Sequence, residues 1–392
     1  MSDGTVDRSS RSDAGPSGRG SSTGLPLFFA SRARRGSHLA ALDGLRGIAV
    51  AIVLLSHLSN ARVHLVPGLD LAGIGKSGVF LFFVLSAFLL ARGLLKAPPR
   101  GFREPRLLGG YFARRFLRIA PLYSVVLVAH WAASRGTALR VEPMDAAALW
   151  RHLSLRAGVS VYWAIPVEVS FYAVLPGVAF ALALVRRYGD TLRLIAIAAA
   201  ALAAALWIPS APARTNSIEL APYLSAFLIG VCAAVVHRGL DAHPSGEGRA
   251  SRETLLEGLA ITSGLALLVL TPVGWANLVG RGVPRDYFHD RVASYALLWS
   301  IFLIGSLHGR GFLRGILSWK PLRWLGIVSF SLYLWHLPIL NALVDHMPRR
   351  PRWEVALVVL AASSVVAALS YLAIERPFLH SAWVRRALAR LA

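Results

Sequence analysis

Two ionisable residues lie in a long apolar segment near the start of the sequence. Arg46 and His57 are eleven positions apart in LDGLRGIAVAIVLLSH. Eleven residues make about three turns of an α-helix, so both side chains face the same way, ~16 Å apart. Arg46 could bind a phosphate or carboxylate, and His57 could act as a general base near neutral pH. Alternatively, Arg46 extends to the membrane surface and His57 hydrogen-bonds a neighbouring helix. We interpret Asp43 as the N-cap of this helix.

A basic run follows in YFARRFLRIAPLY, which contains Arg114, Arg115 and Arg118. Arg114 and Arg118 are one helical turn apart and share a face, with Arg115 beside them. Guanidinium groups match phosphate oxygens, so the run predicts a binding site for a pyrophosphate. The alternative is a positive anchor that holds the helix end at anionic lipid headgroups.

Later apolar segments contain a carboxylate and a histidine. Glu168 is the only Asp, Glu, Lys or Arg between residues 156 and 186, so it needs a partner on another helix or a neutralising proton. We interpret it as an acid/base or histidine-orienting group, with a structural pair to an arginine as the alternative. Tyr333 and His336 are three residues apart and could face one cavity. Anchoring at the membrane interface would also explain Tyr333.

The composition indicates that these residues belong to a membrane protein. The chain has 392 residues, of which 55% are hydrophobic and 16% charged, whereas soluble domains carry about 25% charged residues. The net charge of +22 could indicate nucleic-acid binding, but the basic residues lie between apolar runs, as in cytoplasmic loops. We therefore expect no nucleic-acid partner. A single cysteine, Cys232, excludes an intramolecular disulfide and a thiolate metal cluster, and we expect no metal.

Ten apolar segments predict an all-α, polytopic membrane bundle of about ten transmembrane helices. The segments are 44–63, 73–95, 112–134, 162–185, 191–209, 219–237, 255–277, 291–309, 322–344 and 354–375. Some carry about 20 residues without a charge, enough for a ~30 Å hydrocarbon core. The charge-free stretches 47–61 and 77–91 have only 15 residues each, which favours helices around a water-filled cavity. The distribution of Lys and Arg favours cytoplasmic termini.

The same patterns predict three parts of the chain. Residues 1–38 form a disordered basic cytoplasmic tail, 39–380 form the membrane domain, and 381–392 form a short cytoplasmic tail. We expect no signal peptide, because the first apolar run is too short for one. We also expect no appended soluble domain, since few residues follow the last span.

Together these motifs resemble acyltransferase family 3, whose members are integral membrane enzymes that O-acylate bacterial surface polysaccharides and some macrolides. The resemblance extends over about residues 39–380 and begins with Arg46 and His57. It continues through FFVLSAFL (82–89), RRFLRIAPLY (114–123), WAIPVEVSFYAVLP (163–176), SFSLYLWHLP (329–338) and ERP (375–377). Ala87 stands where the family usually has glycine. Its methyl group is expected to reduce the space for a neighbouring backbone or ligand, and so to affect which acyl chain or acceptor fits.

The resemblance implies an enzyme of the inner or plasma membrane that moves an acyl group, with acetyl as first choice, from cytoplasmic acyl-CoA to a hydroxyl of a carbohydrate or glycosylated acceptor. It implies that the CoA phosphates bind Arg46, Arg114, Arg115 and Arg118, that His57 and Glu168 are catalytic, and that the acceptor binds Ser86, Tyr333 and His336. His57 would be a general base or a transiently acylated group. The alternatives are a macrolide O-acyltransferase, a proton-coupled secondary transporter, and a non-catalytic lipid-binding protein.

Overall fold

The computed structural model describes residues 37–136, 142–188, 203, 206–242 and 248–380. These residues form helices and turns, and no strand occurs among them. The predicted tails and most of the predicted span 191–209 lie outside the described residues.

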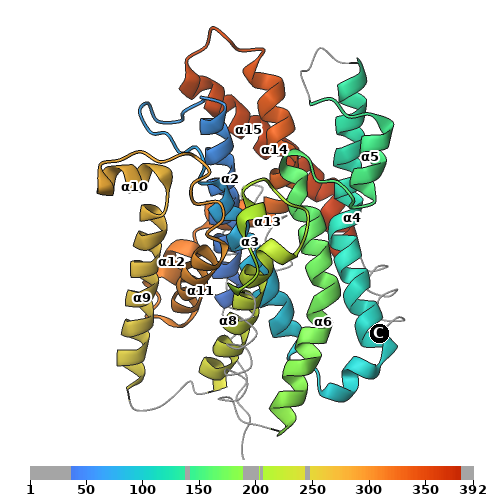
Figure 1. Ribbon diagram of the computed structural model, residues 1–392, viewed down its shortest axis with the longest axis vertical. Helices are drawn as coiled ribbons and strands as arrows, with labels where there is room; N and C mark the ends of the chain where they lie inside the picture. The colour runs from blue at the N-terminus through green and yellow to red at the C-terminus, as the bar shows by residue number, and fades with distance from the viewer. Residues whose placement is uncertain (1–36, 137–141, 189–202, 204–205, 243–247, 381–392) are drawn as a thin grey trace, which may run out of the picture. The chain divides into compact units, whose positions relative to one another are not determined.

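Nine long helices dominate the described part of the chain (Figure 1). They are α2 (Ser37–Asn60), α3 (Gly75–Leu94), α4 (Pro105–Gly136), α6 (Ala164–Tyr188), α8 (Leu224–Ala242), α9 (Arg249–Val269), α11 (Val292–His308), α14 (Ser329–Val344) and α15 (Arg352–Ser370). Shorter helices connect them, among which α5 (Ala146–Leu153), α10 (Pro272–Val279), α12 (Phe312–Leu317), α13 (Lys320–Ile327) and α16 (Arg376–His380) are α-helical. A 3₁₀ turn, η2 (Ser160–Trp163), leads into α6, and a π-helical turn, η5 (Tyr371–Glu375), follows α15.

The described residues contain fewer straight membrane spans than the ten that the sequence predicts. Six helical segments are long and apolar enough to cross a membrane, and the number reaches eight if each of two bent pairs is one span. The predicted span 255–277 is divided into α9 and α10, which meet at 88°, and the span 322–344 is divided into α13 and α14, which meet at 77°. The predicted span 291–309 forms α11, which has only 17 residues.

Local chemistry and helix packing explain the two bends. At the first bend, the hydroxyl of Thr271 accepts a hydrogen bond from the backbone N–H of Gly274 at 2.9 Å, and Pro272 begins α10, so a new helix starts there. At the second bend, α13 lies against α2 so closely that a Cβ on Gly326 would be 1.7 Å from the carbonyl oxygen of Asp43. Only glycine fits this approach, and the contact holds α13 at an angle to α14.

The prediction that Asp43 caps the first helix was wrong. Helix α2 begins at Ser37, so Asp43 lies inside it and is buried. The apolar pattern misled because Leu39–Leu42 already belongs to the helix. The backbone carbonyl of Asp43 lies against Gly326, where α13 packs closely on α2.

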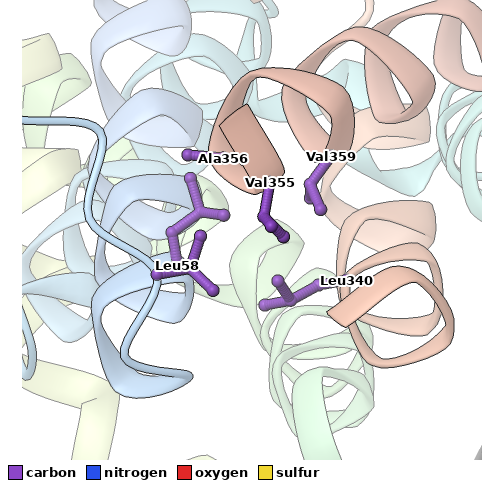
Figure 2. Close-up of a cluster of buried hydrophobic side chains, with 6 residues drawn as sticks. Leu58, Leu340, Val355, Ala356 and Val359 are labelled. Atoms are coloured by element: carbon purple, nitrogen blue, oxygen red, sulfur yellow. The ribbon is translucent and has the colours of Figure 1, made fainter. Parts of the chain in front are cut away.

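A cluster of apolar side chains joins the end of α2 that carries His57 to α14 and α15 (Figure 2). Its buried members are Leu58, Val63, Leu340, Val355, Ala356 and Val359. Lipid tails are as apolar as these side chains, so close van der Waals packing rather than water exclusion holds such helices together. The cluster fixes the rotation of α2 relative to α14, which determines what His57 can contact.

Candidate active site

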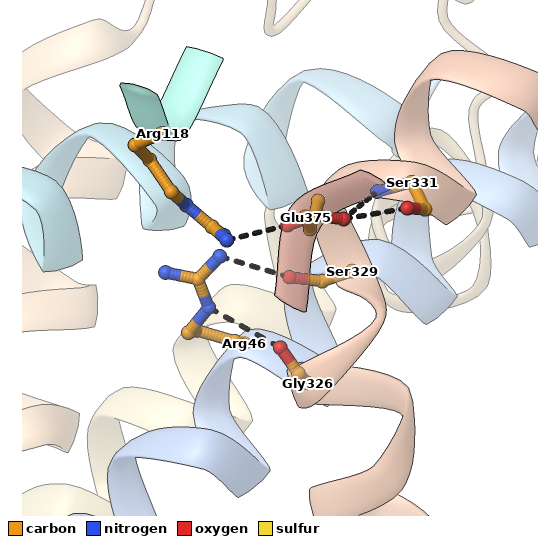
Figure 3. Close-up of polar contacts among 6 residues, drawn as sticks. All are labelled: Arg46, Arg118, Gly326, Ser329, Ser331 and Glu375. Atoms are coloured by element: carbon orange, nitrogen blue, oxygen red, sulfur yellow. Dashed lines mark hydrogen bonds and ion pairs between the residues drawn. The ribbon is translucent and has the colours of Figure 1, made fainter. Parts of the chain in front are cut away.

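Helix α2 presents Arg46 towards the bend between α13 and α14 (Figure 3). Its Nε donates to the carbonyl oxygen of Gly326 at 3.3 Å, and its Nη2 donates to Oγ of Ser329 at 3.0 Å. Carbonyl groups in the last turn of a helix have no partner within that helix, so the end of α13 provides an acceptor for the guanidinium group. The bend therefore fixes the side chain of Arg46.

Arg118 reaches the same place from α4. Its Nη1 forms an ion pair with Oε2 of Glu375 at 2.5 Å, and Figure 3 shows its guanidinium group next to that of Arg46. Glu375 is buried in the π-helical turn, and its Oε1 accepts from the backbone N–H and the hydroxyl of Ser331. Two neighbouring guanidinium groups repel each other, so an anion bound between them would be stabilising.

A carboxylate lies on the other side of these arginines. Oε1 of Glu168, on α6, accepts from the hydroxyl groups of Ser86 at 2.7 Å and Tyr172 at 2.5 Å. Arg115 lies over the ring of Tyr172, 5.8 Å from its centroid. Among the described residues Glu168 forms no ion pair with an arginine, so the structural pair that was the alternative from sequence is not observed.

These side chains line one cavity, which we call the arginine cavity. Its polar lining residues are Arg46, Ser86, Arg115, Arg118, Glu168, Tyr172, Ser329 and Tyr333. Arg114 does not line it and is exposed on α4. On α4 the cavity therefore contains Arg115 and Arg118, which are three residues apart, and not Arg114. Three of the four predicted phosphate ligands, Arg46, Arg115 and Arg118, come together.

His57 lies at the other end of the same face of α2 and contacts His336. Nδ1 of His336 donates to the carbonyl oxygen of Tyr333 at 2.7 Å, so in neutral His336 the Nε2 atom is an acceptor. Nδ1 of His57 lies 2.9 Å from the carbonyl oxygen of Val53 and 3.1 Å from Nε2 of His336, so Nδ1 carries the proton. In neutral His57 the lone pair is then on Nε2, where a general base needs it.

His57 lines a second cavity, which we call the histidine cavity. Its polar lining residues are Ser56, His57, Asn60, Lys76, Ser160, Arg214, Asn216, His289 and Tyr333. His336 does not line either cavity, because it lies buried behind His57, so the structure does not support its predicted contact with the acceptor. Ser86 and Glu168 line only the arginine cavity, so Glu168 is not the group that orients His57.

Tyr333 and Val79 line both cavities and form the boundary between them. The hydroxyl of Tyr333 donates to the carbonyl oxygen of Val161 at 2.7 Å, which holds the ring across this boundary. Ala87, by contrast, lines neither cavity and lies on the face of α3 against Gly230 of α8. The expectation that its methyl group selects the acyl chain or acceptor is therefore not supported.

Sequence reasoning missed seven polar residues of the histidine cavity, namely Ser56, Asn60, Lys76, Ser160, Arg214, Asn216 and His289. Lys76 directly precedes the charge-free stretch 77–91, whereas Ser160, Arg214, Asn216 and His289 lie between the long helices without a recognisable motif. Burial lowers the pKa of His289, which lies between α10 and α11, below its usual value of 6.5. A signal for two lining residues is their backbone, since Ser160 and Asn216 have φ of 60° and 58°. Such left-handed residues are often found at functional sites.

One group in the described part of the chain could hold a metal ion. Ligand atoms of His237, Asp241 and His308 all lie within 4.8 Å of one another, and Nδ1 of His237 is 2.7 Å from Nε2 of His308. The group joins the C-terminal part of α8 to the last turn of α11 and lines neither cavity. It is therefore separate from the candidate active site.

The fold and these cavities define a multi-pass helical membrane protein with a polar site among its helices. A family model described as an acyltransferase domain matches residues 39–375. The chain belongs to this acyltransferase family.

Curated relatives support the assignment at low identity. The chain is 26% identical over 365 residues to the peptidoglycan O-acetyltransferase OatA of Listeria monocytogenes, which covers 87% of this chain and 56% of that protein. It is 26% identical over 393 residues to the putative peptidoglycan O-acetyltransferase YrhL of Bacillus subtilis, with 87% and 55% covered. It is 25% identical over 372 residues to the putative membrane-bound transacylase BcsY of Komagataeibacter xylinus, with 89% and 84% covered.

The chain thus spans about half the length of OatA and YrhL. No solved structure matches the chain.

Proposed function

We propose that the chain transfers an acyl group, with acetyl as first choice, from acyl-CoA to a hydroxyl group of a carbohydrate. The observation that carries the proposal is the arrangement of two cavities along one face of α2, separated by Tyr333. Arg46 lines one cavity and His57 the other. A long donor whose phosphates bind the arginines could extend its thioester past Tyr333 towards His57.

In the arginine cavity, Arg46, Arg115 and Arg118 bind the phosphates of the donor. Guanidinium groups donate paired hydrogen bonds to phosphate oxygens, and the adjacent arginines gain most from an anion between them. Glu168, held by Ser86 and Tyr172, balances part of this positive charge when no donor is bound. Arg114 has no part in this site, because it lies outside the cavity.

In the histidine cavity, Nε2 of His57 accepts the proton of the acceptor hydroxyl as its oxygen attacks the carbonyl carbon of the thioester. The carbon–sulfur bond then breaks, and the leaving thiolate takes the proton from His57, so the histidine returns to its starting state. His336 holds His57 in the required tautomer through the contact between Nε2 of His336 and Nδ1 of His57. We assign His57 the role of general base, because this hydrogen bond leaves Nε2 free to take a proton.

We further propose that the protein lies in the inner or plasma membrane with both termini in the cytoplasm. Acyl-CoA is a cytoplasmic metabolite, so the arginine cavity would face the cytoplasm and the histidine cavity the opposite side. The acceptor would then be a hydroxyl on a surface polysaccharide or a related glycoside. OatA and YrhL carry the name peptidoglycan O-acetyltransferase, which supports a sugar acceptor.

Thermal stability of the purified protein with acetyl-CoA tests the donor site. A ligand that binds only the folded state stabilises it by RT ln(1 + [L]/Kd), so the unfolding midpoint should rise with acetyl-CoA concentration. We expect Arg46→Ala to weaken the binding of acetyl-CoA by about 10- to 100-fold, since hydrogen bonds to charged groups contribute about 1.5–3 kcal/mol. Arg114→Ala is the matched control and should retain the shift.

The outcome also separates an acyltransferase from the proton-coupled transporter considered from sequence. No shift with folded wild-type protein, or an equal loss in the Arg46 and Arg114 variants, would contradict the proposed donor site. Consumption of acetyl-CoA with release of free thiol would exclude the transporter.

A further inference from the structure

The histidine cavity has a strong excess of basic side chains. Lys76, Arg214, His57 and His289 line it, and no Asp or Glu is among the lining residues in the described part of the chain. Its other polar groups are hydroxyls and amides, which donate and accept hydrogen bonds as sugar ligands require. A cavity built for a neutral sugar alone would not need Lys76 and Arg214 in a lining without a carboxylate.

Lys76 and Arg214, the two long basic side chains of the cavity, are in different situations. Arg214 forms an ion pair with Asp290 at 2.9 Å, and its side chain is 43% exposed. Lys76 is 8% exposed, and its Nζ donates to the carbonyl oxygen of Ala213 and lies 4.4 Å from the ring centroid of Trp163. Among the described residues, no carboxylate forms an ion pair with Lys76. The charge of Arg214 is thus balanced within the protein, whereas that of Lys76 has only dipolar and ring partners.

A buried ammonium group without a carboxylate is costly, because a carbonyl oxygen and an aromatic ring replace only part of its hydration. Lys76 is the second residue of α3, so the positive end of the helix dipole adds to the potential at the same place. Both features favour a negatively charged ligand group beside Nζ. An anion there would form a charge-assisted hydrogen bond in a site of low dielectric constant.

We infer that the acceptor carries a carboxylate or phosphate group close to the hydroxyl that is acylated, and that Lys76 binds this group. The inference deepens the proposed function, on which it rests for the role of the cavity. His57 and Lys76 line the same cavity, so one sugar residue with its acidic substituent can contact both. Lys76 is then the residue that selects acidic over neutral acceptors.

The test measures binding rather than turnover, with ligands that differ in one group. Methyl β-D-glucoside, methyl β-D-glucuronide and glucose 1-phosphate provide the neutral sugar, its carboxylate counterpart and a sugar phosphate. Each is titrated by calorimetry into purified wild-type protein, Lys76→Gln and Lys96→Gln. Lys96 is exposed just beyond the opposite end of α3, so Lys96→Gln is the matched control.

We expect wild-type protein and Lys96→Gln to bind at least one of the acidic ligands ten times or more tighter than the glucoside. Lys76→Gln should remove this preference, so that the three ligands bind equally to the variant, and Lys76→Arg should restore part of it. The comparison of glucuronide with glucose 1-phosphate identifies which anion is preferred. Equal binding of the three ligands, including no binding of any, overturns the inference, as does a preference that survives in Lys76→Gln.

These outcomes are distinct from those of the donor test. A preference that depends on Lys76 in a protein without response to acetyl-CoA would refute acetyl-CoA as the donor but keep the anion site. A normal response to acetyl-CoA with equal binding of the three sugars would support the donor site and refute the anion site.

Discussion

The arginine cavity and the histidine cavity share Tyr333 and Val79, but they are built differently. Every polar residue of the arginine cavity lies on a long helix, and Glu375 forms an ion pair with one of its three arginines, Arg118. The histidine cavity takes Ser160, Arg214, Asn216 and His289 from segments between the long helices. Connectors tolerate change more easily than packed helices do. Such a division would let the acceptor site change while the donor site stays the same.

The largest expected effect is a loss of acyl transfer without a loss of acetyl-CoA binding, which would distinguish the roles of the two cavities. His57→Ala removes the proposed base, and general base catalysis contributes about 10²–10⁴-fold, so acetyl transfer should fall by at least about a hundredfold. The arginine cavity does not include His57, so the acetyl-CoA-dependent rise in the unfolding midpoint should persist. Radiolabelled acetyl transfer and thermal unfolding of the same sample measure the two effects. Activity above a few per cent of wild type would remove His57 from the mechanism.

A second variant disturbs the arginine cavity through packing alone. Gly326→Ala places a methyl group 1.7 Å from the carbonyl oxygen of Asp43, so α13 must move away from α2. We expect a loss of about 2 kcal/mol or more in the free energy of unfolding and weaker acetyl-CoA binding, since Arg46 loses its carbonyl partner. Gly315→Ala is the control, because a Cβ at Gly315 has no atom within 4 Å. Equal effects of the two substitutions would contradict the close packing of α13 on α2.

The smallest effect concerns the histidine cavity and pH. Burial is the main cause that lowers the pKa of His289 in the folded protein, and Lys76 and Arg214 add to it, whereas the hydrogen bond to Gly73 and the charge of Asp286 oppose it. Because the pKa of His289 is lower in the folded than in the unfolded chain, the unfolded chain binds this proton more readily. The free energy of unfolding is therefore unaffected by this histidine above pH 6.5 and declines as pH falls below 6.5. We expect His289→Gln to reduce this decline in the unfolding midpoint. An identical pH profile for the variant would contradict the shift.

The helical segments could largely be predicted from sequence, because apolar runs of membrane length form helices wherever they occur. The bend at Gly326 could not, because it depends on a contact with Asp43, which is far from it in the chain. The bend at Thr271 has a local signal, a cap followed by Pro272, which the interpretation of 255–277 as one span overlooked. The sequence also could not show which of Arg114 and Arg115 faces the cavity. Both i, i+3 and i, i+4 pairs share a helix face, so spacing alone does not tell which pair with Arg118 faces the cavity.

By itself the sequence determined that Arg46 and His57 lie on one face of one helix, about three turns apart, because helical periodicity is a local property. It also determined the resemblance to membrane acyltransferases, which the family match confirms. Tertiary structure alone decided that His57 meets His336, that Glu375 pairs with Arg118, and that Lys76 faces the same cavity as His57. These relations depend on the rotation and depth of each helix against its neighbours, which close packing sets and no local pattern encodes.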